Sequence, residues 1–197
     1  MKKSLLILAL TVFSFANAQK GTILVLGNVG YSSQNSNSSG GSPDYKSFNF
    51  SPKVGYQYND SWTVGVESSI ANSKQTYTSG EYKSNSFSAG GFLRYSKPLG
   101  GIFSAYADLG AGYHSAKQTQ YNDNGTANPY LSTLKGNGFY VGVTPALLLN
   151  INKGFGLNFN LGSIGYSTLN YNNSGNDTQN FNFSFGQAFS IGISKNF

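Results

Sequence analysis

The 197-residue sequence contains no cysteine and only one histidine, one methionine and one tryptophan. Without cysteine the chain has no disulfide, no thiolate metal site and no attachment point for a lipoprotein anchor. Charged residues make up 10% of the sequence, whereas a soluble protein of this size usually carries about a quarter. This composition indicates a sheet protein that separates its apolar and polar groups by alternation.

Long apolar runs are also missing beyond the N-terminus, where no stretch reaches the roughly 20 residues of a spanning helix. If the chain crosses a membrane, it crosses with strands. The N-terminus has the pattern of a secretory signal peptide, with two lysines, an apolar stretch and an Ala16-Asn17-Ala18 cleavage site. We therefore expect residues 1–18 to be a cleaved signal peptide and residues 19–197 to form one domain. Cleavage leaves 11 basic and 7 acidic residues, and a net charge of +4 does not indicate a nucleic-acid partner.

The sequence is rich in glycine, tyrosine and phenylalanine, and the stretch 181–197 shows how they are arranged. Its odd positions are mostly large and apolar, including Phe181, Phe183 and Phe185, while most even positions carry Asn, Ser, Gly or Ala. A period of two is typical of a strand with one apolar and one polar face. The terminal stretch is therefore a predicted strand.

The same alternation recurs along the chain and predicts eight strands, at 21–31, 48–58, 62–70, 87–95, 102–114, 138–150, 155–166 and 181–197. The polar faces are too small to form a core, so we expect the apolar faces to meet lipid. The sheet must then close, because hydrocarbon cannot satisfy an open edge. Long polar connections at 32–47, 72–85, 115–135 and 170–180 alternate with short turns. This alternation of long and short connections predicts an all-β, eight-stranded antiparallel up-and-down transmembrane barrel with both termini in the periplasm.

Three further features refine this prediction. Aromatic residues at the strand ends predict two interfacial girdles. Pro52 and Pro145 lie within strands, where each removes a ladder hydrogen bond, and we expect bulges there. The first strand also carries Leu24 and Leu26 on its otherwise polar face. The predicted girdle residues are Tyr31, Phe48, Phe87, Tyr113, Phe139 and Phe181 at the loop side, and Tyr58, Trp62, Tyr95, Phe103, Phe155 and Phe197 at the turn side.

Several segments resemble the family of outer-membrane β-barrel domain proteins, the small eight-stranded barrels of diderm bacteria. These are Ser51-Pro52-Lys53-Val54-Gly55-Tyr56, the turn Asn59-Asp60 with Trp62-Thr63-Val64-Gly65, and Phe92-Leu93-Arg94-Tyr95. The C-terminal alternation of Phe189, Ile191, Ile193 and Phe197 is similar to the signal that the barrel-assembly machinery recognises. The resemblance covers nearly all of the mature chain and implies an outer-membrane location. It brings no catalytic motif with it.

Four charged residues have inward parity on successive predicted strands: Lys53, Glu67, Arg94 and Asp108. They stand at comparable heights above the nearest turn, and their signs alternate, which predicts a salt-bridged ladder across the lumen. An eight-stranded barrel is just wide enough for its interior to be filled by side chains. We therefore favour a structural plug over a narrow ion path lined by the same charges.

Other functions have weaker support in the sequence. His114 beside Ser115 could suggest a lipid-modifying enzyme, but adjacent strand residues point to opposite faces and no orienting carboxylate is evident. No cofactor motif is present, and one histidine with scattered acids does not indicate a metal site. A soluble ligand-carrying barrel of lipocalin type is disfavoured because its cavity would be crowded by the phenylalanine-rich faces.

The sequence thus predicts an outer-membrane barrel with a structural or surface-interaction role. Its expected partners are outer-membrane lipid, the barrel-assembly machinery during insertion, and an extracellular ligand bound through the loops. A narrow porin-like channel is the alternative. The loops are rich in Ser, Asn, Gly and Tyr, a composition suited to surface contact and equally to solvated, partly disordered chain.

Overall fold

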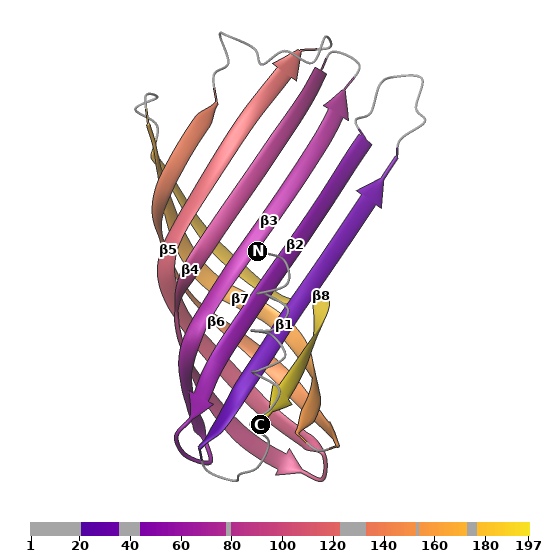
Figure 1. Cartoon of the computed structure of the whole chain (residues 1–197), viewed down its shortest axis with the longest axis vertical. Helices are drawn as coiled ribbons and strands as arrows, with labels where there is room; N and C mark the ends of the chain where they lie inside the picture. Colours follow the sequence, from indigo (N-terminus) through magenta and orange to yellow (C-terminus); the bar gives the residue numbers. More distant parts are fainter. Residues whose placement is uncertain (1–20, 36–43, 78–79, 123–132, 153, 173–176) are drawn as a thin grey trace, which may run out of the picture.

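A computed structural model of the chain describes residues 21–35, 44–77, 80–122, 133–152, 154–172 and 177–197 (Figure 1). Consecutive strands pair antiparallel, and β8 pairs with β1, so the sheet is a closed barrel. The predicted eight-stranded up-and-down barrel is confirmed. No helix among these residues has the length and apolar character needed to span a membrane. The strands are β1 (Thr22–Gln34), β2 (Asp44–Gln57), β3 (Trp62–Tyr77), β4 (Gly80–Gly100), β5 (Phe103–Asn122), β6 (Leu134–Asn152), β7 (Phe155–Tyr171) and β8 (Asp177–Asn196).

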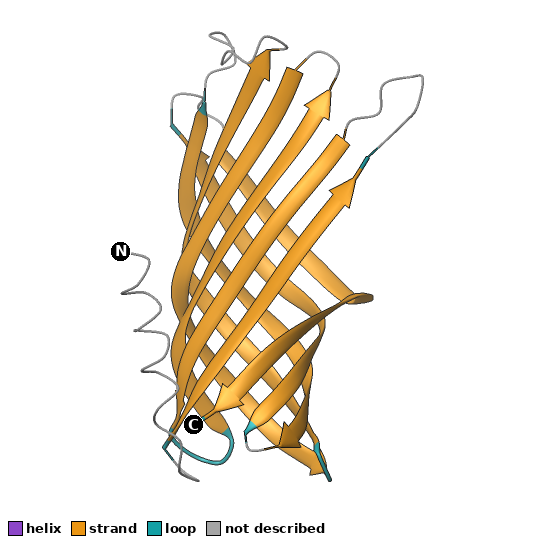
Figure 2. Cartoon of the chain, turned by 45° about the vertical axis from the view of Figure 1, so that its right-hand side comes forward, coloured by secondary structure: helices purple, strands orange, loops and turns teal. Residues whose placement is uncertain are grey.

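At one end of the barrel, short turns join consecutive strands (Figure 2). In the turn between β2 and β3, the Asn59 side-chain oxygen accepts hydrogen bonds from the backbone N–H groups of Ser61 and Trp62, at 2.9 and 2.8 Å. This local pairing is a common way for asparagine to stabilise a tight turn. The described chain ends meet at the same end, where the Phe197 N–H donates to the Ile23 carbonyl at 3.0 Å.

The outer face of the barrel is apolar. Phe181, Phe183 and Phe185 of β8 are 69%, 66% and 62% exposed, and large apolar residues on the other strands are exposed in the same way. The inner face holds charged residues such as Arg94 and Asp108, which are buried. The predicted assignment of sides is confirmed for these side chains, and the outer surface has the character of a lipid-facing wall.

The turn-side girdle prediction was wrong for Phe197, which is 7% exposed and not on the outer surface. Its backbone is held against Ile23 of β1, and the ammonium group of Lys195 lies 5.5 Å from its ring centroid. Leu24 and Leu26 are also buried, as their parity on the polar face of β1 requires. The apolar outer face thus coexists with a few apolar groups inside.

The four long connections are shorter than predicted, because the strands continue beyond the aromatic residues at the loop end. The clearest case is 72–85, where β3 runs to Tyr77 and β4 begins at Gly80. Polar residues on both faces suggested a loop, but above the membrane both faces of a hairpin meet water. Cross-strand pairs such as Lys74 with Glu81 stabilise the extension.

The two prolines behave differently from each other. A register shift between Val143 and Ala146 on the β6–β7 ladder confirms the bulge expected at Pro145. The prediction of a bulge at Pro52 was wrong, because the β2–β3 register is the same at Phe50 and at Lys53. The register is kept here without an extra residue, and the Ser51 and Ser69 hydroxyls lie 2.9 Å apart beside the proline.

The terminal strand is less regular than its sequence alternation suggests. Asn160 pairs with Ser190 and Gly162 pairs with Phe185, so one residue of β7 faces the four residues 186–189 of β8. Gly186 has a φ of 71°, a conformation that favours glycine. Below this irregularity β8 pairs with β1 from Leu24 to Gly27, and these pairs close the barrel.

Candidate functional site in the barrel lumen

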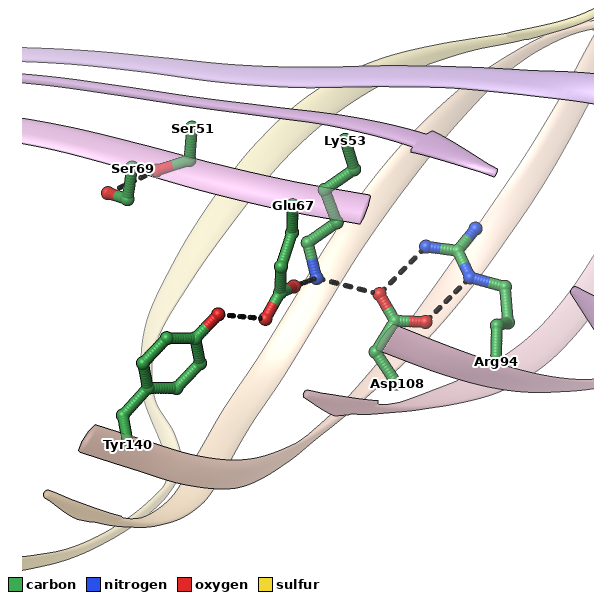
Figure 3. Close-up of polar contacts among 7 residues, drawn as sticks. All are labelled: Ser51, Lys53, Glu67, Ser69, Arg94, Asp108 and Tyr140. Atoms are coloured by element: carbon green, nitrogen blue, oxygen red, sulfur yellow. Dashed lines mark hydrogen bonds and ion pairs between the residues drawn. The ribbon is translucent and has the colours of Figure 1, made fainter. Parts of the chain in front are cut away.

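The lumen charge cluster consists of Lys53 on β2, Glu67 on β3, Arg94 on β4 and Asp108 on β5. Lys53 pairs in register with Glu67, and Arg94 pairs in register with Asp108. Each pair therefore projects to the same face from neighbouring strands. The structure brings all four side chains together inside the barrel (Figure 3).

Arg94 and Asp108 form the most buried part of the cluster, at 3% and 4% exposure. Arg94 Nε donates to Asp108 Oδ1 at 2.6 Å, and Arg94 Nη2 donates to Asp108 Oδ2 at 2.9 Å. This bidentate geometry is the strongest form of a guanidinium–carboxylate contact. Both charges are thereby compensated within the low-dielectric interior.

Lys53 joins the two pairs. Its Nζ lies 2.7 Å from Glu67 Oε2 and 3.0 Å from Asp108 Oδ2. The second contact runs from β2 to β5, across two intervening strands, so it bridges the lumen (Figure 3). A second bridge runs from β6 to β3, where the Tyr140 hydroxyl donates to Glu67 Oε1 at 2.8 Å. The cluster therefore reaches across the lumen rather than lining one wall.

The arrangement differs from the predicted ladder in one link. Among the described residues no ion pair joins Glu67 to Arg94, although their strands are neighbours. The strands of a barrel are staggered, and Arg94 pairs in register with Thr63 rather than with Glu67. The connection is made instead by the long Lys53 side chain, which reaches Asp108.

Aromatic rings surround the charges, and the sequence reasoning did not include them in the cluster. The Arg94 guanidinium lies 3.7 Å from the ring centroid of Tyr106, and Lys53 Nζ lies 5.2 Å from that of Phe92. Both rings are buried, at 5% and 3% exposure. Tyr106, Phe92 and Tyr140 all have inward parity, so parity alone could have assigned them to the lumen. Contacts between cations and ring faces add to the stability of such a cluster.

The remaining predicted candidates lie apart from the cluster. The Ser115 hydroxyl donates to the Phe87 carbonyl at 3.4 Å, on the opposite face of β5 from His114. Ile193 is exposed on the outer face, whereas Phe189 and Ile191 lie in β8 but their side chains are outside the described part. Within the described ranges, no group of three or more His, Cys, Asp or Glu is placed to hold a metal ion.

A closed eight-stranded barrel with an apolar outer wall and a charge-paired interior defines a small integral membrane barrel. The sequence matches the family described as "Outer membrane protein beta-barrel domain" over residues 5–189. The chain belongs to this family, and it crosses the outer membrane with its strands.

The comparison with solved structures finds outer-membrane barrels similar to this chain. A major outer membrane protein from Thermus thermophilus has 11% identity and a TM-score of 0.52, covering 91% of this chain and 100% of that chain. OprG from Pseudomonas aeruginosa has 15% identity and a TM-score of 0.47, covering 92% of this chain and 98% of that chain. Ail from Yersinia pestis, solved with the heparin analogue sucrose octasulfate, has 17% identity and a TM-score of 0.45, covering 91% and 100%. No curated protein matches the sequence.

Proposed function

We propose that this protein is an outer-membrane barrel whose lumen is plugged and whose specific contacts are made at the loop end. The observation that supports the plug is the pair of bridges across the lumen, Lys53 to Asp108 and Tyr140 to Glu67. The four charges sum to zero and are engaged with one another. An ion passing through would have to separate these buried contacts, at a large energetic cost.

The proposal includes an orientation and a maturation step. Residues 1–18 are removed as a signal peptide, the short turns and both mature termini lie in the periplasm, and the long connections face outward. The assembly machinery recognises the terminal strand through Phe189, Ile191, Ile193 and Phe197. The meeting of Ile23 and Phe197 at the turn end supports a common side for both termini.

The same proposal assigns no catalytic role to the chain. The sole histidine, His114, and its neighbour Ser115 point to opposite faces of β5, so they cannot act as a base and nucleophile pair. The loop connections are rich in Ser, Asn, Gly and Tyr, residues suited to adaptable surface contacts. A role in binding an extracellular carbohydrate, lipid or protein follows from this placement.

Cells that display the protein test the surface role. Wild-type cells and cells carrying a Gly-Ser replacement of residues 123–132 are incubated with arrays of immobilised carbohydrates, lipids and extracellular proteins. We expect the wild type to bind at least one probe and the replacement to lose that binding. Equal binding by both, with equal amounts of folded barrel, would refute a role for this connection.

A narrow channel is the second candidate, because charged side chains do occupy the lumen. A channel would require the Lys53–Asp108 bridge to open at rest. Conductance of the purified protein in planar lipid bilayers separates the two functions.

A further inference from the structure

The apolar band on the outer wall has a defined upper limit on β2 to β6. On β3 it runs from Trp62 to Ile70 and on β4 from Phe87 to Tyr95, which is nine residues on each strand. Strands of about 9–11 residues suffice to cross a membrane. The strands continue well beyond this band at the loop end, where β3 ends at Tyr77 and β4 begins at Gly80.

A row of lysines lies just above the band on the same outer face. We call it the lysine row: Lys46, Lys74, Lys83, Lys117 and Lys135. The ladders place Lys46 opposite Lys74, Lys74 opposite Lys83, and Lys117 opposite Lys135. On β3 to β6 each lysine stands four residues beyond an apolar residue of the band, with Asn or Ser between them. Four residues correspond to about 13 Å along a strand.

An open groove of about 580 Å³ lies across β3 to β6 at this level. Its lining includes Ile70, Phe87 and Tyr113 from the apolar band and Lys117 and Lys135 from the lysine row. Asn72, Asn85, Ser115 and Asn137 lie between the two levels and also line it. Along the strands, the groove is therefore apolar at its lower end, polar in the middle and cationic at its upper end.

The charges of the lysine row are only partly compensated. Glu81 forms ion pairs with Lys74 and with Lys83. The pKa of the Glu81 carboxyl is held below its usual range, mainly by the hydrogen bond from Lys74 and next by the hydrogen bond from Lys83. By contrast, no carboxylate of the described chain forms an ion pair with Lys117 or Lys135, which stand directly opposite each other. Two like charges in this position repel each other, so an anion bound between them would stabilise the pair.

We propose that this groove binds the phosphate-bearing headgroup of an outer-leaflet lipid. Lys117 and Lys135 contact the phosphate, Asn85 and Asn137 contact polar groups of the headgroup, and the acyl chains lie against Phe87 and Tyr113. The inference rests on the orientation under Proposed function, since the loop end must be at the outer leaflet. It adds a site on the outer wall that is independent of the connections themselves.

The position of the groove favours a membrane lipid over a soluble polyanion. A headgroup lies at the edge of the hydrocarbon, and the lysine row lies about 13 Å along the strand from that edge. The apolar residues and the lysines line one continuous groove, so a single amphiphilic molecule can contact both. A soluble anion would contact the lysines alone and not Ile70, Phe87 or Tyr113.

Titration by native mass spectrometry tests the site with the folded protein in detergent micelles. The probes are bisphosphorylated lipid A, the same lipid without phosphates, inorganic phosphate and dextran sulfate. The variants are Lys117→Gln, Lys135→Gln and both together, and Lys97→Gln at the short-turn end is the charge-matched control. Gel mobility before and after heating verifies that each variant is folded.

We expect the wild type to prefer the phosphorylated lipid, and each groove substitution to weaken its binding by about tenfold. Lys97→Gln should leave binding unchanged. The proposal is overturned if the wild type binds both lipids equally, if it prefers dextran sulfate or inorganic phosphate, or if Lys97→Gln matches the groove variants. Failure of the surface role would appear instead in the cell-binding experiment, with this lipid preference intact.

Discussion

At the scale of single residues, the stability of the barrel depends on how completely its buried charges are paired. Arg94 and Asp108 share two hydrogen bonds inside the lumen, and Lys53 contacts both carboxylates of the cluster. Lys74 and Glu81 also form an ion pair, at the surface, where the lysine side chain is 44% exposed. Water solvates the exposed pair and not the buried one.

Replacement of Arg94 therefore tests the cluster directly. We expect Arg94→Ala to lower the free energy of unfolding by about 3–5 kcal/mol, because Asp108 is left buried without its main partner. The exposed counterpart Lys74→Ala should cost less than about 1 kcal/mol. Urea unfolding in lipid vesicles measures both. Equal losses for the two variants would contradict the structural role of the cluster.

Two adjacent glycines offer a second comparison. A methyl group on Gly90 would overlap the carbonyl oxygen of Ala111 and lie 2.6 Å from the Tyr140 hydroxyl, whereas one on Gly91 meets nothing closer than 3.6 Å. We expect Gly90→Ala to cost about 1–3 kcal/mol through overpacking. Gly91→Ala should be neutral or stabilising by up to about 1 kcal/mol. Thermal unfolding of both variants checks this, and a reversed order would show that the interior is loosely filled.

At the scale of elements, the sequence predicted the eight strands and the order of their connections. Alternation of large and small residues specifies which face meets lipid on most strands, although β1 carries Leu24 and Leu26 on its inner face. It did not predict how far the strands extend, because beyond the membrane both faces of a hairpin are polar, as at 72–85. It also could not show that residues 186–189 of β8 stand opposite one residue of β7, since register depends on the partner strand.

The contacts in the lumen likewise could not be predicted from the alternation within single strands. Inward parity placed Lys53, Glu67, Arg94 and Asp108 on one side of the wall, and the structure gathers them. Which of them touch depends on the stagger of the strands and on side-chain reach, and neither is encoded in parity. The bridge from Lys53 to Asp108 and the hydroxyl of Tyr140 therefore emerged only from the three-dimensional structure.

The closure of β8 on β1 leads to a prediction for the terminal residue. Phe197 is buried and exchanges backbone hydrogen bonds with Ile23, whereas Phe155 at the same end is 47% exposed on the outer face. We expect Phe197→Ala to lower the free energy of unfolding by about 3 kcal/mol, and Phe155→Ala to have a smaller effect. Unfolding of both variants in the same vesicles provides the comparison. A larger loss for Phe155→Ala would argue against this closure.

For the molecule as a whole, the orientation of the barrel decides which end meets the extracellular medium. The chain has no cysteine, so a single introduced cysteine reports its own location. We expect Asn35→Cys, at the loop end of β1, to react with a membrane-impermeant maleimide on intact cells. Asp60→Cys, in the short turn between β2 and β3, should react only after the cells are opened. The opposite labelling pattern would invert the proposed orientation and remove the outer-leaflet site with it.

The proposed function requires that the barrel interior is closed by its own side chains, so that the protein acts at its outer surface and not as a pore. The most direct measurement is the conductance of the purified wild-type protein in planar lipid bilayers. The bridges from Lys53 to Asp108 and from Tyr140 to Glu67 predict no steady conductance. A steady wild-type conductance that Lys53→Gln or Arg94→Gln alters would contradict the claim and establish the lumen as an ion path.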